Sequence, residues 1–273
     1  MKKLNLFKGL IVIAMFVFFG NNIMAQGAYV NVNVGYALCM GATTFEDFYN
    51  YTGGENSATI EQVYLSLGKG FNFGGTIGYM FNDNVGAELG LSYLMGGKTE
   101  AKDQYTDGSD TYTLSSNMFR FIPSIVVRAG DESVTPYAKF GAVIGTGSVM
   151  FEYEENYDGD VGMMKTKMNG GIAFGINGAL GVLFELGDNL DFFAEINAIS
   201  MSYAPTKGEV TEATYNGTDL LPNFTTYERE TEFVKEYTYN YETPPSDTEP
   251  SQELKHALPF GSFGINVGVA IDL

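Results

Sequence analysis

The stretch YVNVNVGYAL, residues 29–38, alternates apolar and small polar side chains over its whole length. This period of two predicts an extended strand, with Val30, Val32 and Val34 on one face and Asn31 on the other. A half-buried strand of a soluble protein turns its apolar face inward, whereas a strand of a membrane barrel turns that face outward to lipid. The medium that each face meets therefore decides the fold.

The first 25 residues have the layout of a secretory signal peptide. Three lysines come before or next to the apolar run GLIVIAMFVFF (9–19), which is too short to cross a bilayer as a helix. We expect cleavage after Ala25, so that residues 26–273 form the mature chain as one barrel domain. The alternative is an uncleaved N-terminal anchor.

Composition and charge narrow the class of protein. The expected mature chain has 12 basic and 33 acidic residues, a net charge of −21, and such a surface repels nucleic acid. The 34 Gly, 21 Phe and 18 Tyr of the full 273-residue chain suit an all-β protein. No apolar run of membrane-helix length follows residue 25, so a membrane-spanning form must be a closed barrel.

Alternating segments recur along the chain and predict eight strands. They cover residues 29–38, 71–81, 85–94, 118–127, 135–145, 170–186, 190–200 and 261–273. The connections alternate between tight turns and the long segments 39–70, 95–116, 149–167 and 205–255. This rhythm predicts an all-β, eight-stranded antiparallel up-and-down transmembrane β-barrel with four long extracellular loops and short periplasmic turns. No segment is left over for a plug or a second domain.

The charges indicate which face is which. Of the 33 acidic residues, 24 lie in the four long connections. Four charged residues sit within strands on the face opposite the apolar one, and together they are neutral: Glu88, Arg120, Lys139 and Glu195. We interpret them as an ion cluster that fills the lumen, while the apolar face meets lipid. A soluble, lipocalin-like barrel would need an outer face rich in charge, which these strands lack.

At this point the segments resemble the small eight-stranded outer-membrane barrels, similar to the transmembrane domain of OmpA and the outer-membrane β-barrel domain family. The resemblance covers residues 27–273 and rests on the strand rhythm, on TPYAKFGA (135–142) and on the terminal strand FGINVGVAIDL (263–273). It implies a location in the outer membrane of a Gram-negative cell, contact with lipid and lipopolysaccharide, and insertion by the barrel-assembly machinery. It also implies a charged lumen network at the four strand charges. Family members end in an aromatic residue, whereas this chain ends in Leu273.

The residues give little reason to expect an enzyme, a cofactor or a transition metal. His256 is the only histidine and Cys39 the only cysteine, so a catalytic triad or a His/Cys metal site lacks its parts. We interpret His256 as a solvated loop residue and Cys39 as a small residue at the barrel rim. The acidic run EYEENYDGD (152–160) is expected to be a solvated loop, with weak Ca²⁺ binding as an alternative.

The fourth long connection is the candidate recognition surface. Between residues 225 and 250 it interleaves aromatic residues with acids and threonines, a composition that suits recognition of a protein or glycan. Its candidate contact residues are Tyr227, Phe233, Tyr237, Tyr239 and Tyr241. A surface shield without a partner is the alternative. We therefore expect a non-enzymatic barrel with a structural or adhesive role, or alternatively a narrow conduit for small hydrophobic molecules.

Overall fold

The computed structural model describes residues 27–40, 48–54, 57–130, 133–238, 241–242 and 244–273, so the expected signal peptide lies outside the described residues. Eight strands form the barrel: β1 (Ala28–Cys39), β4 (Gly70–Met80), β5 (Val85–Gly96), β7 (Gly108–Arg128), β8 (Val134–Tyr157), β10 (Ala173–Gly187), β11 (Leu190–Tyr203) and β17 (Ser262–Asp272). Each is antiparallel to the next, and β17 pairs with β1 to close the barrel. The predicted eight-stranded antiparallel barrel is confirmed. Within the described part of the chain, no helix is long and apolar enough to cross a bilayer.

The short turns, the start of β1 and the end of β17 lie together at one end of the barrel, which we call the turn end. Tyr29 at the start of β1 is paired with Asp272 at the end of β17. The β4–β5 turn is held by Asn82, whose side-chain oxygen accepts hydrogen bonds from the backbone N–H groups of Asn84 and Val85. Asparagine favours this local bond, and the turn is tight for that reason. We call the opposite end the mouth.

The two faces of the barrel strands meet different media, as the alternation predicts. In β1, Val32 is 60% exposed and Asn31 is 6% exposed. Large apolar side chains form the same exposed belt on the other strands, among them Phe73, Leu91, Phe119, Phe140, Phe174, Leu180 and Ile265. Aromatic pairs stand near both ends of this belt, such as Tyr36 with Phe71 and Phe184 with Phe192. This outer surface is that of a lipid-facing barrel.

The long connections are mostly strand, where loops were expected. β7 begins ten residues before the predicted start at residue 118, and β8 continues twelve residues beyond the predicted end at residue 145. They are joined by further strands: β2 (Tyr49–Gly53), β3 (Ala58–Gln62), β6 (Thr99–Tyr105), β9 (Asp160–Asn169), β12 (Lys207–Tyr215), β13 (Thr218–Asp219), β14 (Glu230–Val234), β15 (Ser251–Leu254) and β16 (Leu258–Pro259). Side chains here meet water on at least one face, so the apolar alternation that marks a half-buried strand is weak.

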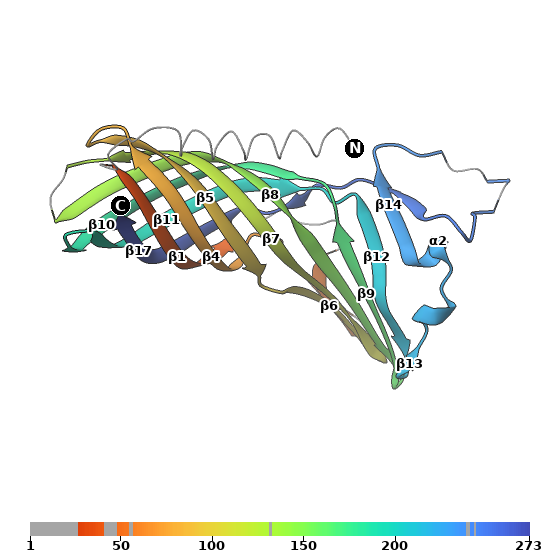
Figure 1. The fold of residues 1–273 in the computed structure, drawn as a ribbon. Helices are drawn as coiled ribbons and strands as arrows, with labels where there is room; N and C mark the ends of the chain where they lie inside the picture. Colours follow the sequence, from red (N-terminus) through yellow and green to blue (C-terminus); the bar gives the residue numbers. More distant parts are fainter. Residues whose placement is uncertain (1–26, 41–47, 55–56, 131–132, 239–240, 243) are drawn as a thin grey trace.

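We call the part beyond the mouth the distal sheet: β2, β3, β6, β9, β12, β14 and β15 with residues 108–117 of β7 and 147–157 of β8. Its order is β3, β2, β6, β7, β8, β9, β12, β14, β15, with parallel pairing only at β2–β6 and β14–β15 among the described strands. Figure 1 shows β6, β7, β8, β9 and β12 running together away from the barrel, with β14 and the short helix α2 (Thr226–Arg229) set beside them. The 3₁₀ turn η1 (Leu221–Asn223) precedes α2.

Two hairpins at the tip of the distal sheet use the same turn chemistry. Asp158 and Gly159 join β8 to β9, and Asn216 and Gly217 join β12 to β13, all with positive φ angles. Asp-Gly and Asn-Gly pairs favour the two-residue turn that needs this backbone, and its twist matches that of the strands.

A segment of the first long connection closes the mouth, contrary to the expectation that no segment would act as a plug. Leu65, Ser66 and Leu67 are at most 1% exposed. They pack with mouth residues of the barrel wall, including Leu94, Met118, Val143 and Ile199. The Ser66 hydroxyl donates to the Gly261 carbonyl, and the Leu67 carbonyl accepts from the Ser116 hydroxyl at 2.8 Å. Because the segment is short and its leucines are ordinary core residues, no sequence pattern marked it.

Candidate functional site

The lumen is stacked in layers from the turn end to the mouth. Nearest the turn end, Val126, Leu183 and Phe193 form a small apolar cluster with Tyr137 and Ala270. Above it lies a charged layer, and the apolar mouth core with its plug covers the top. All eight barrel strands contribute to these layers because every second residue of each strand points inward.

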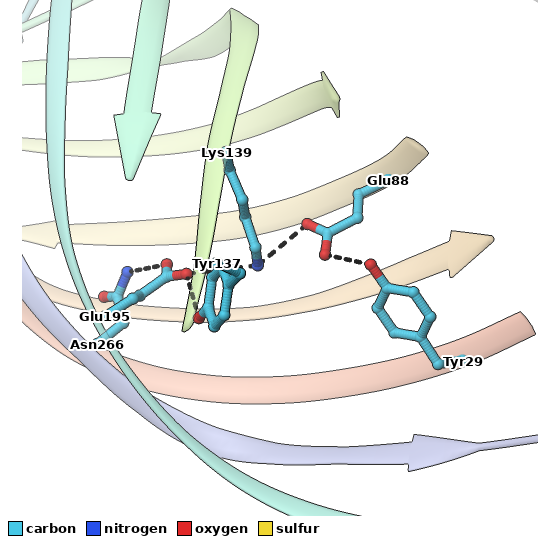
Figure 2. A network of polar contacts seen from close by, with 6 residues as sticks. All are labelled: Tyr29, Glu88, Tyr137, Lys139, Glu195 and Asn266. Carbon is cyan, nitrogen blue, oxygen red and sulfur yellow. Dashed lines mark hydrogen bonds and ion pairs between the residues drawn. The ribbon is translucent and has the colours of Figure 1, made fainter. Parts of the chain in front are cut away.

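The charged layer centres on Lys139 (Figure 2). Its Nζ lies 3.1 Å from Glu88 Oε2 and 3.3 Å from Glu195 Oε2. The Tyr29 hydroxyl donates to Glu88 Oε1 at 2.5 Å, and the Tyr137 hydroxyl donates to Glu195 Oε2 at 2.9 Å. One ammonium thus bridges two carboxylates, each of which also accepts a hydrogen bond from a tyrosine.

Three residues of this network were not among the four lumen charges that the sequence predicts. Tyr29, Tyr137 and Asn266 all contact its carboxylates, and the Asn266 amide donates to Glu195 Oε1 at 3.0 Å. The alternation of their strands places all three on the lumen face, so the sequence does contain a signal for their orientation. Contact itself depends on the register between neighbouring strands, which the alternation does not contain.

The two tyrosine–glutamate contacts are built in the same way. In the strand register, Tyr29 is opposite Gly78, which is opposite Glu88. Four strands further around the barrel, Tyr137 is opposite Gly181, which is opposite Glu195. A Cβ at either glycine would overlap the tyrosine ring, so the ring lies across the glycine to reach the carboxylate beyond it. The lumen glycines therefore make room for aromatic rings.

Arg120 lies apart from this network. It is 4% exposed, and its Nε donates to the Ser92 hydroxyl at 3.0 Å. All four charged residues nevertheless line one polar cavity of about 60 Å³, together with the amides of Asn72, Asn177, Asn197 and Asn266 among others. That volume is enough for only a few water molecules. A second cavity of about 10 Å³ lies toward the turn end.

The lumen therefore holds no ligand-sized space in the described residues. Side chains fill the turn end, a charged network crosses the middle, and the plug segment around Leu67 covers the mouth. This agrees with the general property that an eight-stranded barrel is just wide enough for its own side chains. The arrangement is suited to holding the wall together.

The expected recognition residues of the fourth connection do not form one patch. Tyr227 lies on α2, whereas Phe233 lies on β14 and faces a cavity of the distal sheet. Tyr237 and Tyr241 are 44% and 92% exposed. Tyr239 lies outside the described residues. Their role in binding stays a prediction.

The acidic run at 152–160 is a hairpin rather than an irregular loop. Asp160 accepts hydrogen bonds from the Tyr215 hydroxyl and the Asn216 amide, both at 2.8 Å. These bonds, the one from Asn216 first, lower the pKa of Asp160. In the described part of the chain, no group of three or more His, Cys, Asp or Glu side chains is placed to hold a metal ion.

The single cysteine and the single histidine lie far from the charged layer of the lumen. Cys39 is an exposed thiol at the end of β1, and His256 lines the same cavity of the distal sheet as Phe233.

Comparison with known proteins gives a family and two remote likenesses. Residues 11–226 match the model of the outer membrane protein beta-barrel domain. The structure is similar to Neisserial surface protein A, with 10% identity, a TM-score of 0.37 and coverage of 90% of this chain and 97% of the other. It is also similar to Ail, the attachment invasion locus protein of Yersinia pestis, with 11% identity, a TM-score of 0.29 and coverage of 90% and 99%. No curated protein matches the sequence.

The family match covers most of the chain and agrees with the closed barrel and its apolar outer belt. The protein is therefore one of the outer membrane, and the chain belongs to the outer membrane protein beta-barrel domain family.

Proposed function

We propose that this protein is a non-enzymatic outer-membrane barrel that acts at the cell surface through its distal sheet, in a structural or adhesive role. The observation that carries this proposal is the length of β7 and β8, which have 21 and 24 residues. A transmembrane strand needs about 9–11 residues. Roughly half of each strand therefore projects beyond the bilayer as ordered sheet.

The lumen supports a structural rather than a chemical role for the barrel. Glu88, Lys139 and Glu195 are joined in one ion-pair network, Arg120 is bonded to Ser92, and the lumen cavities are of water size. Export through a signal peptide that is cleaved after Ala25 belongs to the same proposal.

The projecting region also has a charge that limits its partners. Its connecting segments carry 24 of the 33 acidic residues. Sulfated or otherwise anionic glycans would be repelled, so the proposal favours a neutral glycan or a protein surface with basic residues. Divalent ions would be needed between this surface and the phosphates of lipopolysaccharide.

Attachment of displaying cells tests the surface role. Cells would display either the intact chain or a variant with residues 205–255 replaced by a short linker, which removes β12, β14 and β15 from the sheet edge. Adhesion to epithelial monolayers and to immobilised neutral glycans is then counted at matched display levels. We expect adhesion by the intact chain alone; equal adhesion by both, or by neither, contradicts an adhesive role for this edge.

The alternative, a conduit for small hydrophobic molecules, makes a different prediction in a planar bilayer or a liposome. A packed lumen gives no stable conductance and no uptake of an apolar dye beyond that of empty liposomes. Stable single-channel steps, or uptake that depends on the protein, would favour the conduit.

A further inference from the structure

The distal sheet contains a cavity with a volume of about 780 Å³. Its lining residues come mainly from β7, β8, β9, β12, β14 and β15, with further residues from β2, β6, α2 and β16. Its size is within the range of small-molecule sites. It is separate from the small lumen cavities, whose lining shares no residue with it.

The body of the cavity is apolar. Phe151, Met164, Met168 and Phe233 line it, with Tyr112 and Phe48 beside them. The Tyr112 ring centre lies 6.4 Å from that of Phe151 and 5.2 Å from that of Tyr153. A row of aromatic rings on one wall offers both apolar contact and the negative π-faces that attract organic cations.

The charged residues of the lining are acidic. Asp103, Glu228 and Glu253 face the cavity, and among the described lining residues there is no lysine or arginine. Glu228 is occupied, because its Oε2 accepts hydrogen bonds from the Thr225 backbone N–H and hydroxyl. The negative charge of this wall is not balanced within the cavity.

Asp103 is the most unusual of the three acids. Its Oδ1 is buried and has no hydrogen-bond partner in the described part of the chain. It also lies directly opposite Asp110 in the β6–β7 ladder, a pairing of like charges that destabilises a sheet. Burial first, and then the charge of Asp110, raise the pKa of the Asp103 carboxyl, and a hydrogen bond from the Tyr51 backbone only partly offsets them. A cation at this point would relieve both the repulsion and the missing hydrogen bond.

We propose that the distal cavity binds an amphipathic organic cation, a small molecule with an apolar body and an alkylammonium group. The apolar body lies among Phe151, Met164 and Phe233, and the ammonium lies against Asp103 and the Tyr112 ring. Binding here does not require the adhesive role, because the cavity is formed by this chain alone and does not depend on a second surface.

A matched set of probes tests the charge requirement. The full mature chain in lipid nanodiscs is titrated with benzylammonium, benzyl alcohol and phenylacetate, and empty nanodiscs correct for partition into lipid. Binding is followed by saturation-transfer NMR and calorimetry. We expect the cation to bind at least tenfold more tightly than the neutral alcohol, and the anion not to bind. Equal affinity for the cation and the alcohol, or no binding of the cation, overturns the proposal.

Three variants locate the site. Asp103→Asn keeps the side-chain shape and removes the repulsion with Asp110, so it is expected to fold, to lose at least tenfold in affinity for the cation and to change little for the alcohol. Thr166→Phe fills the cavity from β9 and is expected to abolish binding of both. Glu61→Gln on the exposed strand β3 is the control and is expected to change neither.

Each variant must retain the heat-stable barrel on gel electrophoresis. Cation binding that survives both Asp103→Asn and Thr166→Phe in folded protein overturns the proposed site. Binding of a basic amphipathic peptide without binding of the small cation would show a protein-docking surface instead, and would also overturn it.

Discussion

At the scale of single residues, Lys139 is the centre of the lumen. It is the one cation within ion-pair distance of the two buried carboxylates of Glu88 and Glu195 among the described residues. Its ammonium also lies 4.8 Å from the centre of the Tyr137 ring. A buried ion pair of this kind contributes little net stability compared with an apolar core, but removal of one partner leaves an uncompensated buried charge.

Replacement of this lysine is therefore expected to be costly. Lys139→Asn should lower the free energy of unfolding by about 3–5 kcal/mol, because two carboxylates stay buried without their cation. Urea unfolding of the refolded protein in lipid vesicles measures the change. A loss below about 1 kcal/mol would mean that the network does not hold the wall together.

A second variant tests whether the location of the cation matters or only its charge. Asn31 follows Tyr29 by two residues, just as Lys139 follows Tyr137, so the two positions correspond in the two halves of the barrel. Asn31→Lys in the Lys139→Asn background should bring an ammonium to the same two carboxylates and recover most of the lost stability. No recovery would show that the two halves of the lumen are not equivalent.

Sequence reasoning placed Glu88, Lys139 and Glu195 on one face because alternation along a strand determines the face. It grouped Arg120 with them on charge balance, whereas Arg120 bonds to Ser92. Which inward residues touch depends on the stagger between strands, and that is a property of the closed barrel rather than of any one strand. The alternation does not single out the two tyrosines, because a tyrosine on either face fits the pattern.

At the scale of elements, glycines on the lumen face allow the strands to carry bulky rings inward. The Tyr29 ring lies on Gly78 and the Tyr137 ring lies on Gly181. The Phe193 ring lies on Gly268 in the same way. These contacts give a structural reason for a glycine at each of the three positions.

Substitution of such a glycine should therefore destabilise the barrel. Gly78→Ala places a methyl group inside the space of the Tyr29 ring, and overpacking of this kind costs about 1–3 kcal/mol. Gly178→Ala on β10 is the control, because a Cβ there meets nothing within 4 Å. Urea unfolding compares the two variants, and equal stability of both would rule out the ring-on-glycine explanation.

The tip of the distal sheet should respond to acid. The hydrogen bonds from Asn216 and Tyr215 lower the pKa of Asp160 in the folded state. Their stabilising effect is therefore present above 3.8, the ordinary aspartate value, and is lost as the pH falls through the lowered pKa. NMR of the Asn216 side-chain amide from pH 6 to pH 2 should show its release over that range. Asp160→Asn should show the released state at neutral pH, whereas Asp158→Asn should not.

At the scale of the whole molecule, barrel and distal sheet are one hydrogen-bonded body. β7 and β8 pair with each other from Arg128 and Tyr137 near the turn end to Gly108 and Tyr157 at the tip. The sequence indicated the barrel part, where lipid and lumen impose opposite demands on the two faces. It did not indicate the distal part, because water accepts a polar side chain whether the backbone is a strand or a loop.

This continuity predicts the pattern of hydrogen exchange. Amides of residues 146–153 of β8 should be protected to nearly the same extent as those of residues 138–144, since opening one requires separation of the same strand pair. Exchange measured by mass spectrometry in nanodiscs tests this. A sharp fall in protection at the mouth would show that the distal sheet opens independently.

The unbroken course of β8 also determines how the protein responds to force. A pull at the β8–β9 tip acts along the strand, so it loads the hydrogen bonds with β7, β9 and β10 in shear and spreads the load over many of them at once. Bonds loaded together in this way resist far more than bonds that open one after another. Tension from a bound surface would therefore pass straight into the membrane-embedded wall, with no flexible joint between attachment point and anchor along that strand.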